Sequence, residues 1–243
     1  MSHHIVEARA LCHTYPDGHK ALEEITFLIT HGRSVAIVGA NGAGKSTLLL
    51  HLNGCLAPTT GSVRIGDYPV TRKTLLTVRR SVGMVFQDPD DQLFMPTVFD
   101  DVAFGPLNLG LPPDEVEQRV QKALDDVGAA HLRDRPPHRL SGGEKRAVAI
   151  ATVLSMRPDI LVMDEPTSNL DPRSRRLLIE QLNRFEHTKI IATHDLDLVM
   201  DVCEETIVLK HGRIAAQGAT KSLLTDKAML EEVGLELPLR LQR

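Results

Sequence analysis

A glycine-rich segment in the first quarter of the chain carries residues that could bind phosphate. It matches the phosphate-loop pattern and follows a β-rich run; its sequence is Gly39-Ala40-Asn41-Gly42-Ala43-Gly44-Lys45-Ser46-Thr47. Its glycines leave room for successive backbone N–H groups to point at phosphate oxygens, and the positive end of a following helix favours the same anion. We expect Lys45 to reach the β- and γ-phosphates of a nucleotide and the Ser46 hydroxyl to ligate Mg²⁺. Kinases and GTPases share this loop, so it predicts nucleotide binding without deciding the class of enzyme.

Two adjacent acids end an apolar run farther along the chain. Ile160-Leu161-Val162-Met163 precedes Asp164 and Glu165. We expect Asp164 to hold Mg²⁺ through water, and Glu165 to polarise the water that attacks the γ-phosphate. His194 follows the next apolar run, and the carboxyl ends of parallel strands meet at one edge of a sheet. His194 is therefore a candidate to contact the γ-phosphate and orient the water, with a purely structural histidine as the alternative.

Strands that alternate with helices must position these residues. The pattern predicts strands at Ser34–Val38, Ile160–Met163, Lys189–Thr193 and Thr206–Lys210, and helices at Lys45–Leu52, at Arg173–Arg184 and from Asp195. Such alternation is typical of a mostly parallel, buried sheet. Further short β-rich runs lie at Ile5–Ala10, Ile25–Ile29, Val63–Ile65 and Val82–Phe86.

A helical insert is expected after Phe86. Its longest pattern is an amphipathic stretch that begins at Pro112 and ends at about Val127. The tail of the chain carries two short helical patterns, at Lys221–Leu224 and Asp226–Val233. The chain shows no internal repeat.

Composition narrows the class of protein. A chain of 243 residues with 42% hydrophobic and 25% charged residues suits one large globular domain or a domain with an inserted subdomain. The formal net charge of -4 disfavours nucleic acid as a partner. No run approaches the roughly 18 apolar residues of a spanning helix, and the start lacks the apolar core of a secretion signal, so we expect a cytoplasmic protein. Cys12, Cys55 and Cys203 are few and far apart, which favours reduced thiols without an assigned function.

A second glycine motif identifies a family. Leu140-Ser141-Gly142-Gly143-Glu144, followed by Lys145-Arg146, resembles the signature motif of ABC ATPases and precedes the Asp164-Glu165 strand as it does there. The resemblance covers essentially the whole chain. It implies that Tyr15 stacks on adenine, that Gln87 is the glutamine-loop residue and a ligand of Mg²⁺ with Ser46 and Asp164, and that His194 is the switch histidine. It also implies catalytic roles for Glu165, His194 and Gln87, and identifies the loop after the acids as Ser168-Asn169-Leu170-Asp171.

The resemblance implies a fold and a dimer. The expected fold is an α/β phosphate-loop NTPase of the ABC type over residues 1–243, with a mostly parallel sheet core, an N-terminal antiparallel β portion and an inserted helical subdomain. The core would span 1–86 and 158–243, and the helical subdomain, with the signature motif, about 87–157. Because Ser141 opens a second anion-binding helix start, one chain cannot close both helix starts onto one γ-phosphate. In the family a neighbouring subunit completes the site, and Asp171 helps to join the two sites; a homodimer and a pair of paralogues both satisfy this arrangement.

A closer resemblance concerns the transported solute. Val85–Phe94, which includes the segment Asp90-Asp91-Gln92-Leu93-Phe94, is similar to the ATPases of energy-coupling factor importers, especially the cobalt and nickel branch, as are Tyr15–Gly18 and Val102–Pro106. The resemblance implies ATP and Mg²⁺ as cofactors. It also implies two membrane partners, a transmembrane coupling subunit and a substrate-binding subunit, and a peripheral position at the cytoplasmic face of the membrane.

Several alternatives stay open at this point. A vitamin importer of the same type is the first, and Asp90 and Asp91 could simply form a solvated turn. A non-transport ABC ATPase that acts on DNA or ribosomes is disfavoured, because the chain has one cassette and no basic tract. A subunit that binds ATP without hydrolysis would need a changed Glu165, Ser141 or His194. The histidines, 11 in all, are not expected to hold the transported metal, and neither is the pair His3-His4 at the start.

Overall fold

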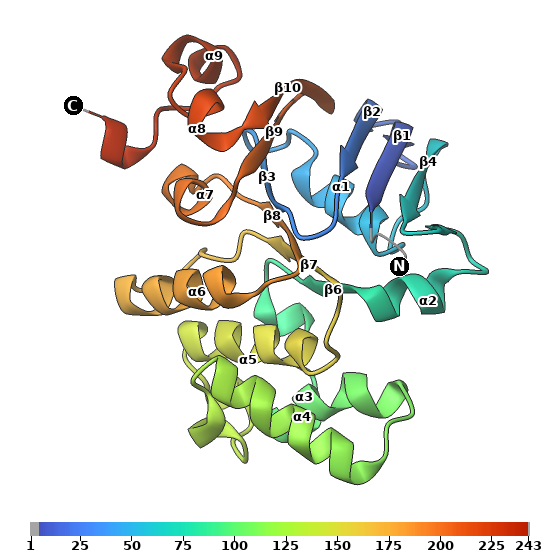
Figure 1. Ribbon diagram of the computed structural model, residues 1–243, viewed down its shortest axis with the longest axis vertical. Helices are drawn as coiled ribbons and strands as arrows, with labels where there is room; N and C mark the ends of the chain where they lie inside the picture. The colour runs from blue at the N-terminus through green and yellow to red at the C-terminus, as the bar shows by residue number, and fades with distance from the viewer. Residues whose placement is uncertain (1–4, 243) are drawn as a thin grey trace. The chain divides into compact units, whose positions relative to one another are not determined.

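The computed structural model describes residues 5–242 and divides the chain into two compact units (Figure 1). The first unit holds the chain up to Val82, then Asp159–Glu165 and the chain from Glu186 onward. The second unit holds Gly83–Pro158 and Pro166–Phe185. The pair His3-His4 lies outside the described residues.

An antiparallel sheet opens the first unit. Its strand order is β2-β1-β4-β5, with β1 at Val6–Thr14, β2 at Lys20–Ile29, β4 at Thr60–Ile65 and β5 at Tyr68–Pro69. Val6 stands opposite Ile29 on one side and Ile65 on the other, and all three side chains are buried. Alternate residues of a strand face one side of a sheet, so these positions form a layer of the core. β1 runs four residues beyond the expected Ala10 and ends immediately before Tyr15.

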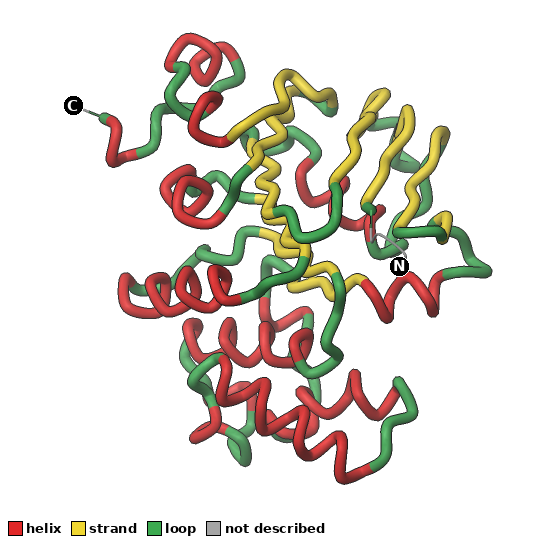
Figure 2. Tube along the Cα trace, in the orientation of Figure 1, coloured by secondary structure: helices red, strands yellow, loops and turns green. Residues whose placement is uncertain are grey.

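A mostly parallel sheet forms the centre of the same unit. Its strands follow the order β10-β9-β3-β8-β7, with β3 at Ser34–Val38, β7 at Ile160–Asp164, β8 at Thr188–Ala192, β9 at Glu205–Lys210 and β10 at Arg213–Ala219. The strands β3, β7 and β8 are buried at every residue and pair in parallel, as expected for a sheet covered on both faces. Figure 2 shows these strands with helices beside them. The expected α/β phosphate-loop fold, with an antiparallel N-terminal portion, is therefore confirmed.

Helix α1, at Lys45–Leu52, is the central helix of the first unit. It contacts β2 and β4 of one sheet and β7 and β8 of the other. Leu48, Leu49 and Leu52 are fully buried, which explains why the helix is apolar on more than one side. The other helices of this unit are α2 at Leu75–Ser81, α7 at Leu196–Val202, α8 at Thr220–Leu223 and α9 at Lys227–Glu232.

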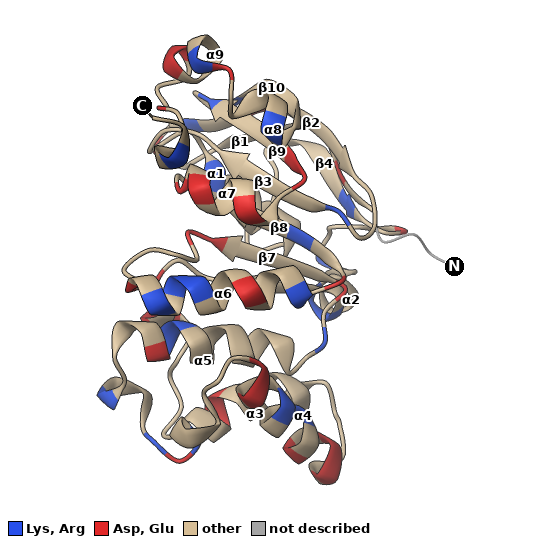
Figure 3. Ribbon diagram, turned by 60° about the vertical axis from the view of Figure 1, so that its left-hand side comes forward, with Lys and Arg blue, Asp and Glu red and all other residues tan. Residues whose placement is uncertain are grey.

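The second unit is helical. It contains η1 at Pro89–Asp91, α3 at Val98–Asn108, α4 at Pro113–Asp126, η2 at Ala130–Leu132, η3 at Pro137–Arg139, α5 at Gly142–Leu154 and α6 at Pro172–Arg184. Helices α3, α4 and α5 contact one another, and each has buried apolar side chains, among them Val102, Val120 and Val148. Acidic and basic residues are interspersed along α4 and α6 (Figure 3). Strand β6, at Val82–Val85, lies where the first unit meets the second in sequence.

Several elements were absent from the sequence-based expectation, and β10, α2 and α3 show why. Strand β10 alternates between exposed and half-exposed residues, so it lacks the buried apolar run that identifies the other parallel-sheet strands. Helix α2 has only Val78 buried, and α3 contains Pro106, which does not normally continue a helix. Among residues 5–242, no helix combines the length and apolar composition needed to cross a membrane.

Candidate ATP site

The phosphate loop joins β3 to α1. Gly44 occupies the position before the helix with φ 103°, a conformation that favours glycine. A Cβ added at Gly39 would lie 2.5 Å from the carbonyl oxygen of Leu209, so that position also requires glycine. The Lys45 ammonium folds back over the loop, where it donates to the carbonyl oxygens of Gly39 at 2.9 Å and Ala40 at 3.3 Å. The loop therefore holds its cation inside the cradle that the sequence predicts.

Glu165 lies beside that cation. Its Oε1 is 3.8 Å from Lys45 Nζ, and both side chains are buried. Its Oε2 accepts hydrogen bonds from Thr193 Oγ1 at 2.9 Å and from the His194 N–H at 3.3 Å, and lies 2.9 Å from His194 Nδ1. The structure thus brings together Lys45, Glu165 and His194 from three separate segments, as the sequence predicts for a catalytic site.

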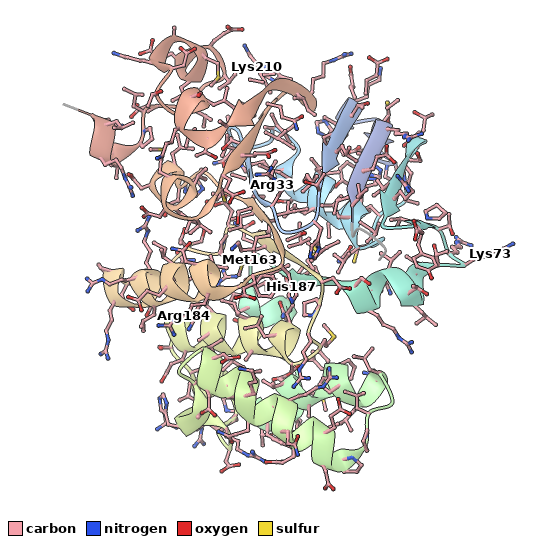
Figure 4. The ribbon with its side chains drawn as sticks, in the orientation of Figure 1. Arg33, Lys73, Met163, Arg184, His187 and Lys210 are labelled. Carbon is pink, nitrogen blue, oxygen red and sulfur yellow. The ribbon has the colours of Figure 1, made fainter. Side chains whose placement is uncertain are left out.

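The backbone at Glu165 aims this carboxylate. Glu165 has φ 44°, a left-handed conformation that a non-glycine residue rarely adopts. Its N–H donates to the carbonyl oxygen of Ala192 at 2.8 Å, so the turn is fixed where β7 and β8 end. Met163, labelled in Figure 4, lies on β7 just before Asp164, which is also buried. Sequence reasoning did not predict the bond from Thr193 to Glu165. The position of Thr193 directly after the buried strand β8, at the carboxyl end of the sheet, could have indicated it.

Oxygen ligands suited to a divalent cation lie near the carboxyl end of β7, beside Glu165. Asp164 ends β7, which α1 contacts, and Ser46 lies exposed in the first turn of α1. The adjacent pair Lys45 and Glu165 shows that these two segments come within contact distance. Hydroxyl and carboxylate oxygens are the ligands that Mg²⁺ prefers, so the chemistry of this donor set fits that ion.

Tyr15 lies against the helix that follows the phosphate loop. Its hydroxyl is 3.0 Å from Thr47 Oγ1, and its side chain is half-buried. Two imidazoles flank it: the His13 ring lies 4.7 Å away and nearly perpendicular, and the His19 ring lies 6.4 Å away and nearly parallel. The structure therefore joins the residue expected to stack on adenine to the last residue of the phosphate loop.

The signature residues form a helix cap in the second unit. Ser141 precedes α5, and its hydroxyl accepts from the Glu144 N–H at 3.4 Å. The Ser141 N–H and hydroxyl each donate to Glu144 Oε2 at 2.8 Å, which completes a capping box. These two hydrogen bonds hold the pKa of Glu144 below its ordinary value. Leu140 is buried, whereas Ser141 and Gly142 are exposed.

The loop after the acids packs beside this cap. Asp171 caps α6 by accepting from the Arg173 and Ser174 N–H groups at 2.9 and 3.1 Å, and from the Ser174 hydroxyl at 2.6 Å. These bonds, chiefly the one from the hydroxyl, lower the pKa of Asp171. A Cβ added at Gly143 would lie 2.9 Å from Ser174 Oγ, so Gly143 allows α5 to approach α6. Of the loop residues, Ser168 and Leu170 are half-exposed, and Asn169 is exposed with φ 61°.

Gln87 is exposed in a segment held against α5. Arg146 is buried and donates to the carbonyl oxygen of Phe86 at 2.7 Å and to that of Gln87. Gln92 Nε2 donates to the carbonyl oxygen of Ala149 at 2.7 Å and to Thr152 Oγ1 at 2.6 Å. Sequence reasoning missed both anchors, although Arg146 lies only two residues after the signature motif.

Comparison with known proteins gives the family. The family model described as ABC transporter matches residues 22–168. A putative ABC transporter ATP-binding protein of Geobacter sulfurreducens is 70% identical over 242 residues, which cover 100% of this chain and 97% of that protein. The energy-coupling factor transporter ATP-binding protein EcfA of Methanocaldococcus jannaschii is 48% identical, with 97% and 86% covered. The structure of cbiO1 from Clostridium perfringens, described as part of the ABC transporter complex cbiONQ, is 43% identical with a TM-score of 0.81, and 96% and 95% are covered.

The chain therefore belongs to the ABC transporter family, in which it is an ATP-binding and ATP-hydrolysing subunit. Within that family, it is an ATPase of the energy-coupling factor type.

Proposed function

We propose that this ATPase uses Mg²⁺-bound ATP to power the import of cobalt or nickel ions through membrane subunits. The observation that carries the catalytic part is the cluster of Lys45, Glu165 and His194, in which a buried cation, a candidate general base and a polar group meet at one edge of the sheet. Ser46, Asp164 and Gln87 would hold Mg²⁺, which supplies charge stabilisation to the transferring phosphoryl group when bound.

Each residue of the cluster has a distinct task in this proposal. A γ-phosphate offers Lys45 a charged acceptor, which is stronger than the carbonyl oxygens of Gly39 and Ala40 that it now binds. Glu165 accepts a proton from the attacking water. Thr193 and the His194 backbone keep the Glu165 carboxylate in place. The His194 side chain is 65% exposed, so it is accessible to a phosphate that enters from solvent.

A second ATPase subunit completes the proposed site. Ser141 and Gly142 are exposed at the start of α5, where backbone N–H groups and the helix dipole favour an anion. In a head-to-tail dimer, these groups would bind the γ-phosphate held by the partner's phosphate loop, and the partner would do the same in return. A second copy of this chain and a paralogue both fit this arrangement.

The membrane partner would dock on the second unit. Phe94 and Phe104 are 64% and 44% exposed, and their rings lie edge to face with centroids 5.1 Å apart. Leu107 is exposed on the same helix as Phe104. An exposed cluster of large apolar side chains is typical of a protein interface, and a coupling helix of a membrane subunit is the proposed occupant. The chain would then lie peripherally at the cytoplasmic face of the membrane.

The proposed solute rests on the segment that begins at Asp90. In the structure, Asp90 pairs with Lys145 at 2.6 Å and Gln92 anchors the segment to α5, so these residues have structural partners within the chain. The segment resembles the cobalt and nickel branch in sequence, and the similarity to cbiO1 supports the same branch. A vitamin importer is the alternative, since vitamin-importing relatives carry similar segments.

Uptake by the native complex tests this proposal. The complex is purified with its membrane subunits and reconstituted in lipid vesicles, and ATP-dependent uptake of cobalt, nickel and biotin is measured in parallel. We expect uptake of a metal ion that stops when Glu165→Gln replaces the wild-type ATPase. Uptake of biotin alone would identify the vitamin branch, and a complex without membrane subunits would contradict the transport function.

A further inference from the structure

Two buried histidines lie behind Tyr15, and no role assigned above uses them. His13 lies near the end of β1 and is 8% exposed, whereas His51 lies in the last turn of α1 and is fully buried. Their ring centroids are 4.7 Å apart, and the ring planes are inclined by 73°. Imidazoles in a core usually have hydrogen-bond partners that fix their protonation, so these partners define what the pair can do.

The hydrogen bonds assign the proton positions on both rings. His51 Nδ1 lies 2.7 Å from the carbonyl oxygen of Thr47, which can only accept, so His51 carries its proton on Nδ1. Burial lowers the pKa of His51, which favours the neutral ring, and with the proton on Nδ1 its Nε2 is an acceptor. His13 Nδ1 lies 3.2 Å from that Nε2 and 3.2 Å from the carbonyl oxygen of Ala57. Both are acceptors, so His13 also carries its proton on Nδ1.

His13 and His51 connect Tyr15, which is expected at the adenine, with Thr47 at the end of the phosphate loop. The His13 ring packs nearly perpendicular to the Tyr15 ring, and perpendicular aromatic contacts fix one ring relative to another. The Tyr15 hydroxyl bonds Thr47 Oγ1, and the Thr47 carbonyl oxygen bonds His51. The contacts therefore form a closed circle through four residues, Tyr15, His13, His51 and Thr47.

We propose that His13 and His51 are positioning residues for ATP, which hold the Tyr15 ring at a fixed place relative to the phosphate loop. A nucleotide bound by Lys45 at its phosphates would then meet the ring at the distance that its ribose and base require. This proposal rests on the proposed binding of ATP with Tyr15 on the adenine. The pair acts on recognition of the base, because neither imidazole bonds the glycines or the ammonium group of the phosphate loop.

The test compares a ligand that has an adenine base with a ligand that has only phosphates. Dissociation constants are measured by calorimetry, with Mg²⁺ present, for the β,γ-methylene analogue of ATP and for inorganic tripolyphosphate. The proteins are the wild type, Tyr15→Ala, His13→Leu and His51→Leu. His31→Leu is a matched control, because His31 is an exposed histidine of the same unit. Thermal unfolding of each variant confirms that it is folded.

We expect His13→Leu and His51→Leu to weaken binding of the ATP analogue by about three- to tenfold, the scale of one lost aromatic contact. Binding of tripolyphosphate should stay within about twofold of the wild type, since both changes spare the Lys45 cradle. His51→Asn should recover part of the lost affinity, because its amide nitrogen takes nearly the place of Nδ1 and can donate to Thr47. His31→Leu should change neither constant.

Three results would overturn the proposal. Equal loss of both ligands in folded variants would show that the pair only supports the loop, and unchanged affinity for the ATP analogue would show that it does nothing for binding. If a leucine variant fails to fold, His13→Gln or His51→Gln replaces it, because a glutamine amide lies near Nε2 and does not restore the bond that Nδ1 makes, and the same comparison decides. A wild type that binds neither ligand would instead refute the proposed ATP site. If Tyr15→Ala weakens binding of the ATP analogue and neither histidine variant does, the positioning role is refuted while the contact between Tyr15 and the nucleotide stands.

Discussion

Replacing Glu165 with glutamine isolates the proposed general base. The change keeps the shape of the side chain, and the amide oxygen can still accept from Thr193 Oγ1 and the His194 N–H, which donate to the carboxylate in the wild type. The amide nitrogen would then face Lys45, whose Nζ lies 3.8 Å from the other carboxylate oxygen. The site should stay folded and should bind ATP at least as tightly, because a negative charge near the γ-phosphate is removed.

The expected loss is confined to the chemical step. A positioned general base contributes about 10²- to 10⁴-fold to a rate, which corresponds to about 3 to 5 kcal/mol of activation free energy. Glutamine cannot take the proton, so we expect a loss of that size in the rate of phosphate release under saturating ATP. The variant should accumulate as an ATP-bound dimer, which elutes earlier in gel filtration with ATP than without it.

Thr193→Val is the matched control for this prediction. It removes one donor to the carboxylate but leaves the base itself, so we expect a loss of only about tenfold, in keeping with one hydrogen bond. Turnover of Glu165→Gln within about tenfold of the wild type would refute the assignment of Glu165 as the base. A monomeric elution profile of Glu165→Gln with ATP would refute the expected dimer.

Three further substitutions and one labelling experiment test other parts of the molecule. Lys45→Ala should weaken ATP binding by about two orders of magnitude in calorimetry, since it removes the cation of the cradle; unchanged affinity would contradict this. Ser141→Arg should stop phosphate release while it spares ATP affinity, and full turnover would disprove the two-chain site. Burial raises the pKa of the Cys203 thiol to about 12, so iodoacetamide at pH 8 should label exposed Cys55 and spare Cys203 in mass spectra of the native protein. Burial also raises the pKa of Asp101 in α3, so its charged form costs stability at neutral and alkaline pH, and the cost disappears as the pH falls and the carboxyl is protonated. Asp101→Asn should therefore increase the free energy of unfolding in urea at pH 8, and increase it less at pH 4.

Short-range patterns explain what could be predicted from the sequence. The phosphate loop is identified by glycines at fixed places among nine consecutive residues, and each of the buried strands β3, β7 and β8 contains a run of apolar residues. Those features follow from local sterics and from burial on both faces. The exposed strand β10 and the weakly buried helix α2 carry no such signal, because few of their side chains face the core.

Contacts between distant segments explain what could not be predicted. Arg146 bonds carbonyl oxygens 60 and 59 residues earlier in the chain, and backbone acceptors leave no mark in a sequence. His13 and His51 are 38 residues apart, and their contact depends on β1 continuing beyond Ala10. The sequence left open whether Asp90 is a solvated turn residue, whereas the structure pairs it with Lys145. In each case the sequence contains the side chain, but the tertiary packing determines which group it contacts.

The capping box at Ser141 has a consequence for how firmly two chains could hold together. Its N–H and hydroxyl already donate to Glu144, and the low pKa keeps that carboxylate charged at neutral pH. A phosphate that bonds the Ser141 N–H or hydroxyl must replace one anion with another, because both donors already bond the Glu144 carboxylate. The net gain is the difference between two similar bonds, opposed by repulsion from the displaced Glu144. In the proposed head-to-tail dimer, a contact balanced in this way would release as readily as it forms, so the two subunits could part after each turnover.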